Sequence, residues 1–302
     1  MRAGKMASIL SVLASGLVAA PAALAQDAAT VIGIPQPGGI GFQPAGTELA
    51  SDLHWLDGFL LIIITVIVVF VTALMAFVAF RFSEKANPTP STFTHNSVVE
   101  VVWTVVPIVI LVAIAIPSLQ LLSKQVTIPE ADLTIKATGN QWYWSYEYPD
   151  PEGEADFAFD SMMVGSGYKD YDTAVANVGD EMAAAGVNRD NYRLQTNTFV
   201  VVPVGKVVRV QVTASDVIHS WTVPAFGVKM DGIPGRLNEI WFQVDEPGIY
   251  YGQCSELCGK DHAYMPISVK AVSEAEYETW LAQAQETYAG VERNVSVASL
   301  SE

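Results

Sequence analysis

Two long apolar runs constrain this chain more than any other feature. Residues 58–80 carry no charged side chain, and residues 98–122 carry a single one. Each run exceeds the roughly 20 apolar residues that a helix needs to cross a bilayer. The segment between them contains Arg81 and Lys85, and basic loops stay on the cytoplasmic side. We therefore expect a hairpin of two transmembrane helices over residues 53–124, with both outer ends on the opposite side of the membrane.

The N-terminus has the pattern of a secretory signal peptide. Arg2 and Lys5 precede an apolar stretch that ends in the A-x-A sequence at residues 23–25, a typical cleavage site. The apolar stretch is too short for a membrane helix. We expect residues 1–25 to be removed, and the Gly- and Pro-rich residues 26–52 to form an irregular arm outside the membrane.

Residues 125–273 have the short alternating pattern of β-strands, separated by turns that contain Gly, Pro and Asn. Many short strands without intervening helices favour an antiparallel sandwich or a Greek-key barrel. The expected strands are residues 132–138, 141–148, 206–214, 220–224, 239–244, 249–253 and 267–272.

Two segments depart from the strand pattern. Residues 162–193 are rich in Gly, Asp and Asn, and we interpret them as an inserted surface excursion with an Ala-rich turn at residues 182–185. Residues 274–302 begin with helical spacing and end in a tail. Ser273 and Glu276 have the spacing of a capping box, which predicts that a helix begins at residue 274.

The charge of the chain is concentrated in its soluble part. Residues 123–302 hold 26 acidic and 12 basic side chains, which accounts for −14 of the formal net charge of −16. The acids crowd between residues 147 and 172, where Lys169 is the single basic residue. Such a surface is either a solvated face or, beside a functional site, a docking surface for a basic protein. Proteins that bind nucleic acids carry basic surface patches, so this acidic composition argues against nucleic-acid binding.

The densest group of metal-binding side chains comprises Cys254, Cys258, His262 and Met265, and His219 is a further candidate upstream. A mononuclear blue-copper site uses one Cys, two His and a weak axial Met, so one of the two cysteines would have no metal to bind. Two copper ions bridged by both thiolates would use every donor. Met265 would then be one axial ligand, and a backbone carbonyl between the cysteines the other.

Other interpretations of these residues remain open. Secreted domains usually pair their cysteines in disulfides, although a bridge across so short a loop would stabilise the fold only weakly. Two Cys and two His also form a common zinc site. A lone histidine such as His219, next to an aromatic residue, is usually part of the packing. Met265 and the wide separation of the histidines favour copper.

Four motifs in order make residues 53–280 resemble subunit II of the haem-copper cytochrome c oxidases. They are QWYWSYEY at 141–148, DVIHSW at 216–221, DGIPGRLN at 231–238 and YYGQCSELCGKDHAYMP at 250–266. The resemblance implies a cupredoxin-like β-barrel that holds a binuclear copper A centre. The implied copper ligands are His219, Cys254, the backbone carbonyl of Glu256, Cys258, His262 and Met265.

The same resemblance implies roles for residues outside the copper site. Trp142 would receive the electron from cytochrome c, although its alternation with Trp144 and Tyr146 is more typical of a core strand. The Glu256 side chain would face a magnesium or manganese ion shared with subunit I. Glu100, at the cytoplasmic start of the second helix, would lie at the mouth of a proton path into subunit I. The acids implied in cytochrome c docking are Glu147, Asp150 and Asp216.

The resemblance further implies that haem, oxygen reduction and proton pumping belong to subunit I, with subunit III as an additional partner. The location would be a bacterial inner membrane, with the copper domain in the periplasm. The chain contains no C-x-x-C-H haem-attachment sequence. Two other functions are a membrane-tethered copper chaperone or thiol-disulfide reductase, and a copper-free quinol oxidase subunit. The two-helix hairpin argues against the first, and the intact donor set argues against the second.

Overall fold

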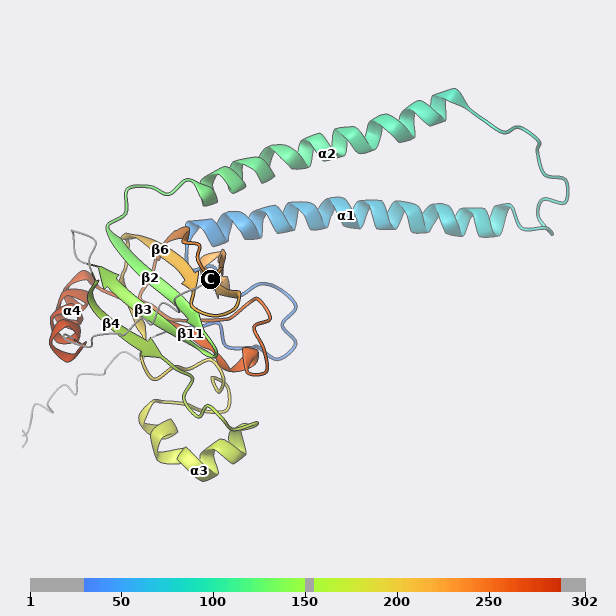
Figure 1. Cartoon of the computed structure of the whole chain (residues 1–302). Coiled ribbons are helices and arrows are strands. Elements are labelled where there is room, and N and C mark those ends of the chain that lie inside the picture. Colours follow the sequence, from blue (N-terminus) through green and yellow to red (C-terminus); the bar gives the residue numbers. More distant parts are fainter. Residues whose placement is uncertain (1–29, 150–154, 289–302) are drawn as a thin grey trace, which may run out of the picture.

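The structure is a computed structural model that describes residues 30–149 and 155–288. The predicted signal peptide, Asp150 and the tail beyond Tyr288 lie outside the described residues. Two long helices project together from a β domain, and Figure 1 shows them side by side.

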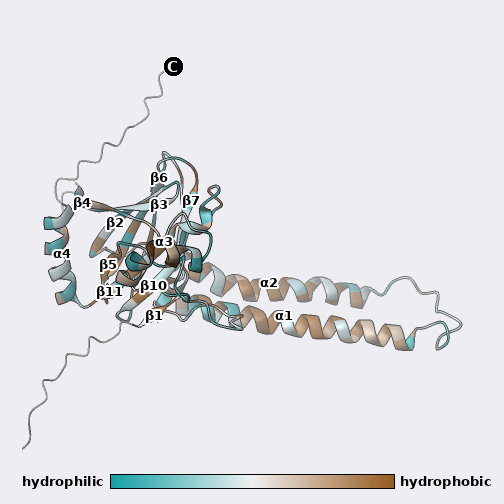
Figure 2. Ribbon diagram, turned by 90° about the horizontal axis from the view of Figure 1, so that it is seen from below, coloured by the Kyte–Doolittle hydropathy of each residue, from teal (hydrophilic) through white to brown (hydrophobic). Residues whose placement is uncertain are grey.

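The two apolar runs form the helices α1 (Glu48–Arg81) and α2 (Ser97–Val126), both long and apolar enough to cross a membrane. Figure 2 shows that hydrophobic residues dominate most of their length. At 1.5 Å per residue, the 34 residues of α1 span about 51 Å, well beyond the ~30 Å hydrocarbon core of a bilayer. The sequence predicted the apolar part correctly, and the extra turns of α1 extend toward the β domain.

The first turn of α1 is built into the β domain. Thr47 caps the helix by accepting the N–H of Ala50 at 3.1 Å, and its hydroxyl donates to the carbonyl of Phe226 at 2.8 Å. Ala50 packs so closely on Gly227 that a Cβ there would lie 2.8 Å from the Cα of Ala50. The hairpin therefore joins the β domain through a buried contact as well as through the chain.

The last turn of α2 is tied to the same junction. Lys124 lies 2.8 Å from the carboxylate of Glu48 and 2.6 Å from that of Asp52. Its backbone carbonyl accepts the indole N–H of Trp241 at 3.1 Å. Both helices thus meet the β domain through specific polar contacts at one end of the hairpin.

The β domain consists of two main sheets and a separate two-stranded ladder within the described residues. The larger sheet has the order β4 (Ala155–Ser161), β3 (Tyr143–Pro149), β2 (Leu133–Asn140), β6 (Val207–Ala214) and β9 (Asn238–Gln243). The other sheet has the order β1 (Val31–Ile32), β10 (Gly248–Gln253), β11 (Pro266–Val272) and β5 (Val200–Pro203). The ladder pairs β7 (His219–Val223) with β8 (Val228–Gly232).

The predicted β architecture is confirmed with two differences. The sheets are mixed, because β2 pairs in parallel with β6 and β11 in parallel with β5. Over the described residues, the hydrogen bonds form separate sheets instead of one closed cylinder. A continuous core joins them, and its largest buried side chains include Trp144, Tyr146, Trp221, Phe242 and Tyr250.

The N-terminal arm is more ordered than its composition suggested. Val31 and Ile32 pair in parallel with Ile249 and Tyr250 of β10. The arm therefore adds a short edge strand to the smaller sheet before it leads into α1, so its prediction as irregular was wrong at these residues.

The excursion at residues 162–193 contains a helix, α3 (Tyr171–Ala184), where the sequence suggested only an Ala-rich turn. Asp170 caps α3 by accepting the N–H of Thr173 at 2.9 Å. Ala174 and Met182 of α3 are buried with Val164 and Val187 in a small separate core. This local core stabilises a helix whose composition alone was ambiguous. Figure 1 shows α3 on the side of the β domain away from the hairpin.

The helix after the last strand, α4 (Glu274–Tyr288), is confirmed. Ser273 and Glu276 form the predicted capping box, in which the N–H of Ser273 donates to the Glu276 carboxylate at 3.0 Å. Trp280 contacts the ring of Tyr148, with ring centroids 5.3 Å apart, so α4 covers one edge of the larger sheet.

Candidate metal centre

The predicted metal-binding residues come from two places in the chain that the fold brings together. His219 begins β7, and the other donors lie in the loop between β10 and β11. That loop closes at its base, where the N–H of Cys254 donates to the carbonyl of Met265 at 3.3 Å. The N–H of Ser255 donates to the carbonyl of Ser220 at 3.0 Å, which attaches the loop to β7.

The donor atoms form two matching groups around the cysteines. The Sγ of Cys254 lies 3.9 Å from Nδ1 of His219 and 3.3 Å from the carbonyl oxygen of Glu256. The Sγ of Cys258 lies 3.6 Å from Nδ1 of His262 and 3.5 Å from Sδ of Met265. Each thiol therefore has one imidazole nitrogen and one weak donor beside it.

The two Sγ atoms are 3.9 Å apart, and both cysteines are free. A disulfide bond is about 2.05 Å long, so this structure does not contain the bridge that the sequence left open. A single four-coordinate zinc would use the thiols and imidazoles but would leave Met265 and the Glu256 carbonyl without a role. The complete set fits two soft, thiolate-bridged copper ions better.

The two neighbouring thiols do not ionise together readily. Burial and the adjacent Cys254 raise the pKa of Cys258 to about 12. Burial raises the pKa of Cys254 as well, but contacts with His219 and backbone groups outweigh it and lower that pKa to about 7. Two thiolates so close together repel each other, so positive metal ions are needed to hold both of them deprotonated at neutral pH.

A second layer of contacts holds the His219 ring. The ring is fully buried, and its Nε2 lies 2.9 Å from Oδ1 of Asp216. Asp216 also accepts the N–H groups of Gln141 and Val217 at 2.8 and 2.6 Å. Burial raises the pKa of Asp216, but these hydrogen bonds outweigh it and keep the pKa below its ordinary value. Asp216, interpreted from the sequence as a docking acid, is thus also the residue that orients an imidazole.

Gly139 provides the space that the His219 ring occupies. A Cβ at this position would lie 2.7 Å from two atoms of the ring. The sequence indicated only a turn at Gly139, because nothing in the local pattern reveals that a distant histidine packs on it.

Trp142 lies in the turn between β2 and β3, not in a strand. Its half-buried indole contrasts with the fully buried Trp144 and Tyr146 that follow it. Its Nε1–H donates to the carbonyl of Cys258 at 3.2 Å. A Cβ at Gly259 would lie 2.9 Å from the ring, so the indole packs directly on the cysteine loop. The turn removes Trp142 from the core pattern that strict alternation suggested.

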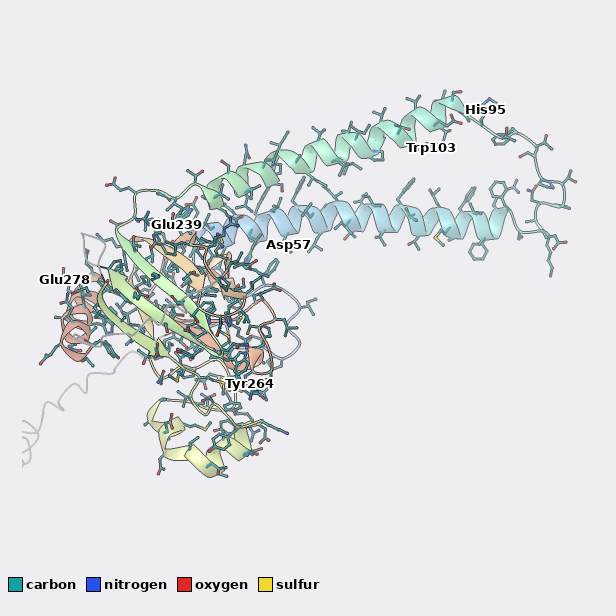
Figure 3. All side chains as sticks on the ribbon, viewed as in Figure 1. Asp57, His95, Trp103, Glu239, Tyr264 and Glu278 are labelled. Atoms are coloured by element: carbon teal, nitrogen blue, oxygen red, sulfur yellow. The ribbon has the colours of Figure 1, made fainter. Side chains whose placement is uncertain are left out.

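The remaining predicted residues are placed differently. Glu147 pairs across the strands with Lys136 at 3.1 Å. Glu256 contributes its carbonyl to the cysteine site, while the residue itself is exposed. Glu100 lies in the first turn of α2, at the end of the hairpin far from the β domain, as Figure 3 shows from the position of His95. The fold therefore brings Trp142, Asp216 and the six donors together, and keeps Glu100 apart.

Comparison with known proteins identifies the family of this chain. The profile of the cytochrome c oxidase subunit II periplasmic domain matches residues 133–272, and that of its transmembrane domain matches residues 35–121. Cytochrome c oxidase subunit 2 of Cereibacter sphaeroides is 56% identical over 274 residues, which cover 90% of this chain and 89% of the relative. This chain belongs to the cytochrome c oxidase subunit II family.

Two further proteins show how far the similarity extends. The probable subunit 2 of Rickettsia bellii is 43% identical and aligns over 88% of this chain and 91% of its own length. The crystal structure of the periplasmic domain of subunit II (CoxB) from Bradyrhizobium japonicum is 48% identical. It covers 54% of this chain and 100% of that domain, with a TM-score of 0.44.

Family membership establishes several of the predictions. The chain is a two-pass membrane protein and a subunit of a haem-copper terminal oxidase, so it associates with other oxidase subunits. The family carries a copper A centre, and this chain has a buried His219, Cys254 and Cys258 group that could bind metal. Family membership therefore decides against the alternative function of a copper chaperone or thiol-disulfide reductase.

Proposed function

We propose that this chain is the subunit at which electrons enter a cytochrome c oxidase. It accepts electrons from reduced cytochrome c at a copper A centre and delivers them to haem in subunit I, where oxygen reduction is coupled to proton pumping. The observation that carries this proposal is the paired arrangement of donors, one imidazole nitrogen and one weak donor beside each of two thiols 3.9 Å apart. When bound there, the copper pair supplies one-electron redox chemistry.

The six donors assigned to copper are held by the fold in advance. Cys254, Cys258, Met265 and His219 are all buried, which keeps water away from the site. One backbone hydrogen bond attaches the cysteine loop to β7, and another closes the loop between Cys254 and Met265. Such support favours electron transfer because a rigid site changes little when it gains or loses an electron. The full set is His219, Cys254, the Glu256 carbonyl, Cys258, His262 and Met265.

Trp142 is the proposed point at which electrons arrive. Its indole reaches the surface on one side and donates a hydrogen bond to the Cys258 carbonyl on the other. It therefore offers a short path of bonded atoms from the outside of the domain to a donor residue of the site.

The proposed docking surface for cytochrome c is acidic. Among the acids that the sequence singled out, Glu147 is partly offset by Lys136, and Asp216 is engaged with His219. Asp150 lies outside the described residues. We therefore assign most of the attraction for a basic donor to the collective charge of the domain, to which Glu147, Asp150 and Asp216 contribute.

Glu256 and Glu100 have proposed roles outside electron transfer. The exposed Glu256 side chain would ligate a magnesium or manganese ion at the interface with subunit I. Glu100 would admit protons to a path in subunit I, and subunit III would complete the assembly. This arrangement requires a bacterial inner membrane with the β domain in the periplasm.

Substitution of the cysteines in the assembled oxidase tests the copper pair. We expect two copper atoms per chain beyond those of subunit I, and Cys254→Ser should change the spectrum of both, because each thiolate would be a ligand of both ions. Ser255→Ala is the matched control, since its exposed side chain lies in the same loop and should leave the spectrum unchanged. One intact copper with its original spectrum in Cys254→Ser would contradict the proposal.

A further inference from the structure

A pocket of about 640 Å³ opens directly beside Trp142. One wall comes from the start of the excursion, including Met162 and Lys169, and the other from the cysteine loop, including Lys260, Asp261 and Tyr264. Figure 3 shows Tyr264 at the end of the β domain that faces α3. A protein that docks over Trp142 must therefore cover this pocket as well.

The pocket gathers positive charge on an otherwise acidic chain. The Nζ of Lys260 lies 5.4 Å from the centre of the Trp142 ring. Arg193 stacks on Tyr264 at 5.1 Å and donates a hydrogen bond to the carbonyl of Lys169, so a third cation connects the two walls. The whole chain has only 16 basic residues against 32 acidic ones, so a pocket lined by two lysines and one acid, with Arg193 beside it, is a local exception.

These cations are poorly neutralised by the chain itself. Lys260 has only the neighbouring Asp261, 3.6 Å away, and an ion pair between two exposed side chains is weak. Within residues 30–149 and 155–288, neither Lys169 nor Arg193 forms an ion pair, although Arg193 also interacts with Asp170 through its charge. The charge of the two lysines is thus available to an incoming group.

The excursion holds its wall of the pocket in a defined position. Its two ends are joined by hydrogen bonds from Val164 N–H to the Gln195 carbonyl at 3.1 Å and from Asn197 N–H to the Met162 carbonyl at 2.9 Å. The small core around Ala174 and Met182 stiffens the segment between them. Lys169, which lines the same pocket as Lys260, therefore belongs to a folded element instead of a loose loop.

We propose that this pocket binds a carboxylate group of the electron-donor protein, placed between Lys169 and Lys260 beside the donor's redox group. The inference rests on the proposed arrival of electrons at Trp142. The acidic domain attracts a basic donor at long range, but it cannot by itself select one orientation. A carboxylate held at the pocket would bring the donor's redox group to Trp142 in one orientation. The two lysines would therefore determine which donor protein reacts.

Charge reversal separates this local role from long-range attraction. Lys169→Glu, Lys260→Glu and the control Lys270→Glu, an exposed residue of β11, each change the net charge from −16 to −18. Long-range attraction of a basic donor predicts equal or faster reaction in all three variants of the assembled oxidase. We expect instead that the two pocket variants lower the second-order rate constant with cytochrome c by about tenfold, while Lys270→Glu does not. Lys260→Arg should retain the rate, since it keeps the charge.

Two further measurements make the result decisive. Reduction by a small uncharged reductant should be equally fast in all variants; a matching loss there would mean that the lysines act on the metal site and would overturn the proposal. Trp142→Ala tests the proposed electron entry separately. This variant should react more slowly with cytochrome c whether or not the pocket binds a carboxylate. If Trp142→Ala slows the reaction but the pocket variants behave like Lys270→Glu, the carboxylate assignment alone fails.

Discussion

At the scale of single residues, Asp216 shows how a surface acid can control a buried ligand. Its carboxylate lies 2.9 Å from the His219 ring and is itself fixed by two backbone N–H groups. We predict that Asp216→Asn lowers the affinity for copper by about 10- to 100-fold, because the ring loses the charged acceptor that sets its orientation. Competition titration of the metal-depleted oxidase measures this change. Glu147→Gln, which removes an acid that contacts no metal donor, should retain the original affinity; equal affinities in both variants would argue against the orienting role.

At the scale of secondary-structure elements, one side chain makes two hydrogen bonds at the junction between α1 and the β domain. Thr47 caps α1 and also bonds the Phe226 carbonyl, and it is only 1% exposed. We predict that Thr47→Ala destabilises the folded chain by about 1–2 kcal/mol, since the cap is lost and a buried carbonyl loses its donor. The midpoint of thermal unfolding in detergent should fall by roughly 2–4 °C. Thr47→Ser keeps the hydroxyl and should unfold near the original midpoint, and an unchanged midpoint for Thr47→Ala would refute the prediction.

At the scale of the whole molecule, charge governs the approach of a partner. The soluble part carries −14 of the net charge of −16, and exposed charges are screened by salt within about 10 Å at 0.1 M. We predict that the second-order rate constant with a basic cytochrome c falls steeply as ionic strength rises. Reduction by a small uncharged reductant should stay constant over the same range. A flat profile with cytochrome c would contradict electrostatic docking.

The sequence alone was sufficient wherever a pattern is local. Charge-free runs predicted the membrane helices, alternation predicted most strands, and the spacing of Ser273 and Glu276 predicted the start of α4. Counting donors also indicated a two-copper site before any geometry was known, because chemical preference depends on residue type. Local patterns failed at α3, whose stability comes from its own small core, and at Trp142, where a turn interrupts the alternation.

The tertiary structure alone decided which distant residues share a site. His219 and the cysteine loop are separated by 34 residues, and only the pairing of β7 and the closure of the loop bring their donor atoms within 4 Å. The same holds for the space that Gly139 leaves for the His219 ring, for the bond between Asp216 and that ring, and for the approach of Lys260 to Trp142. Residue types determine what chemistry a chain can perform, whereas long-range packing determines where that chemistry occurs, because such contacts follow from the folding of the whole chain and not from neighbours in sequence.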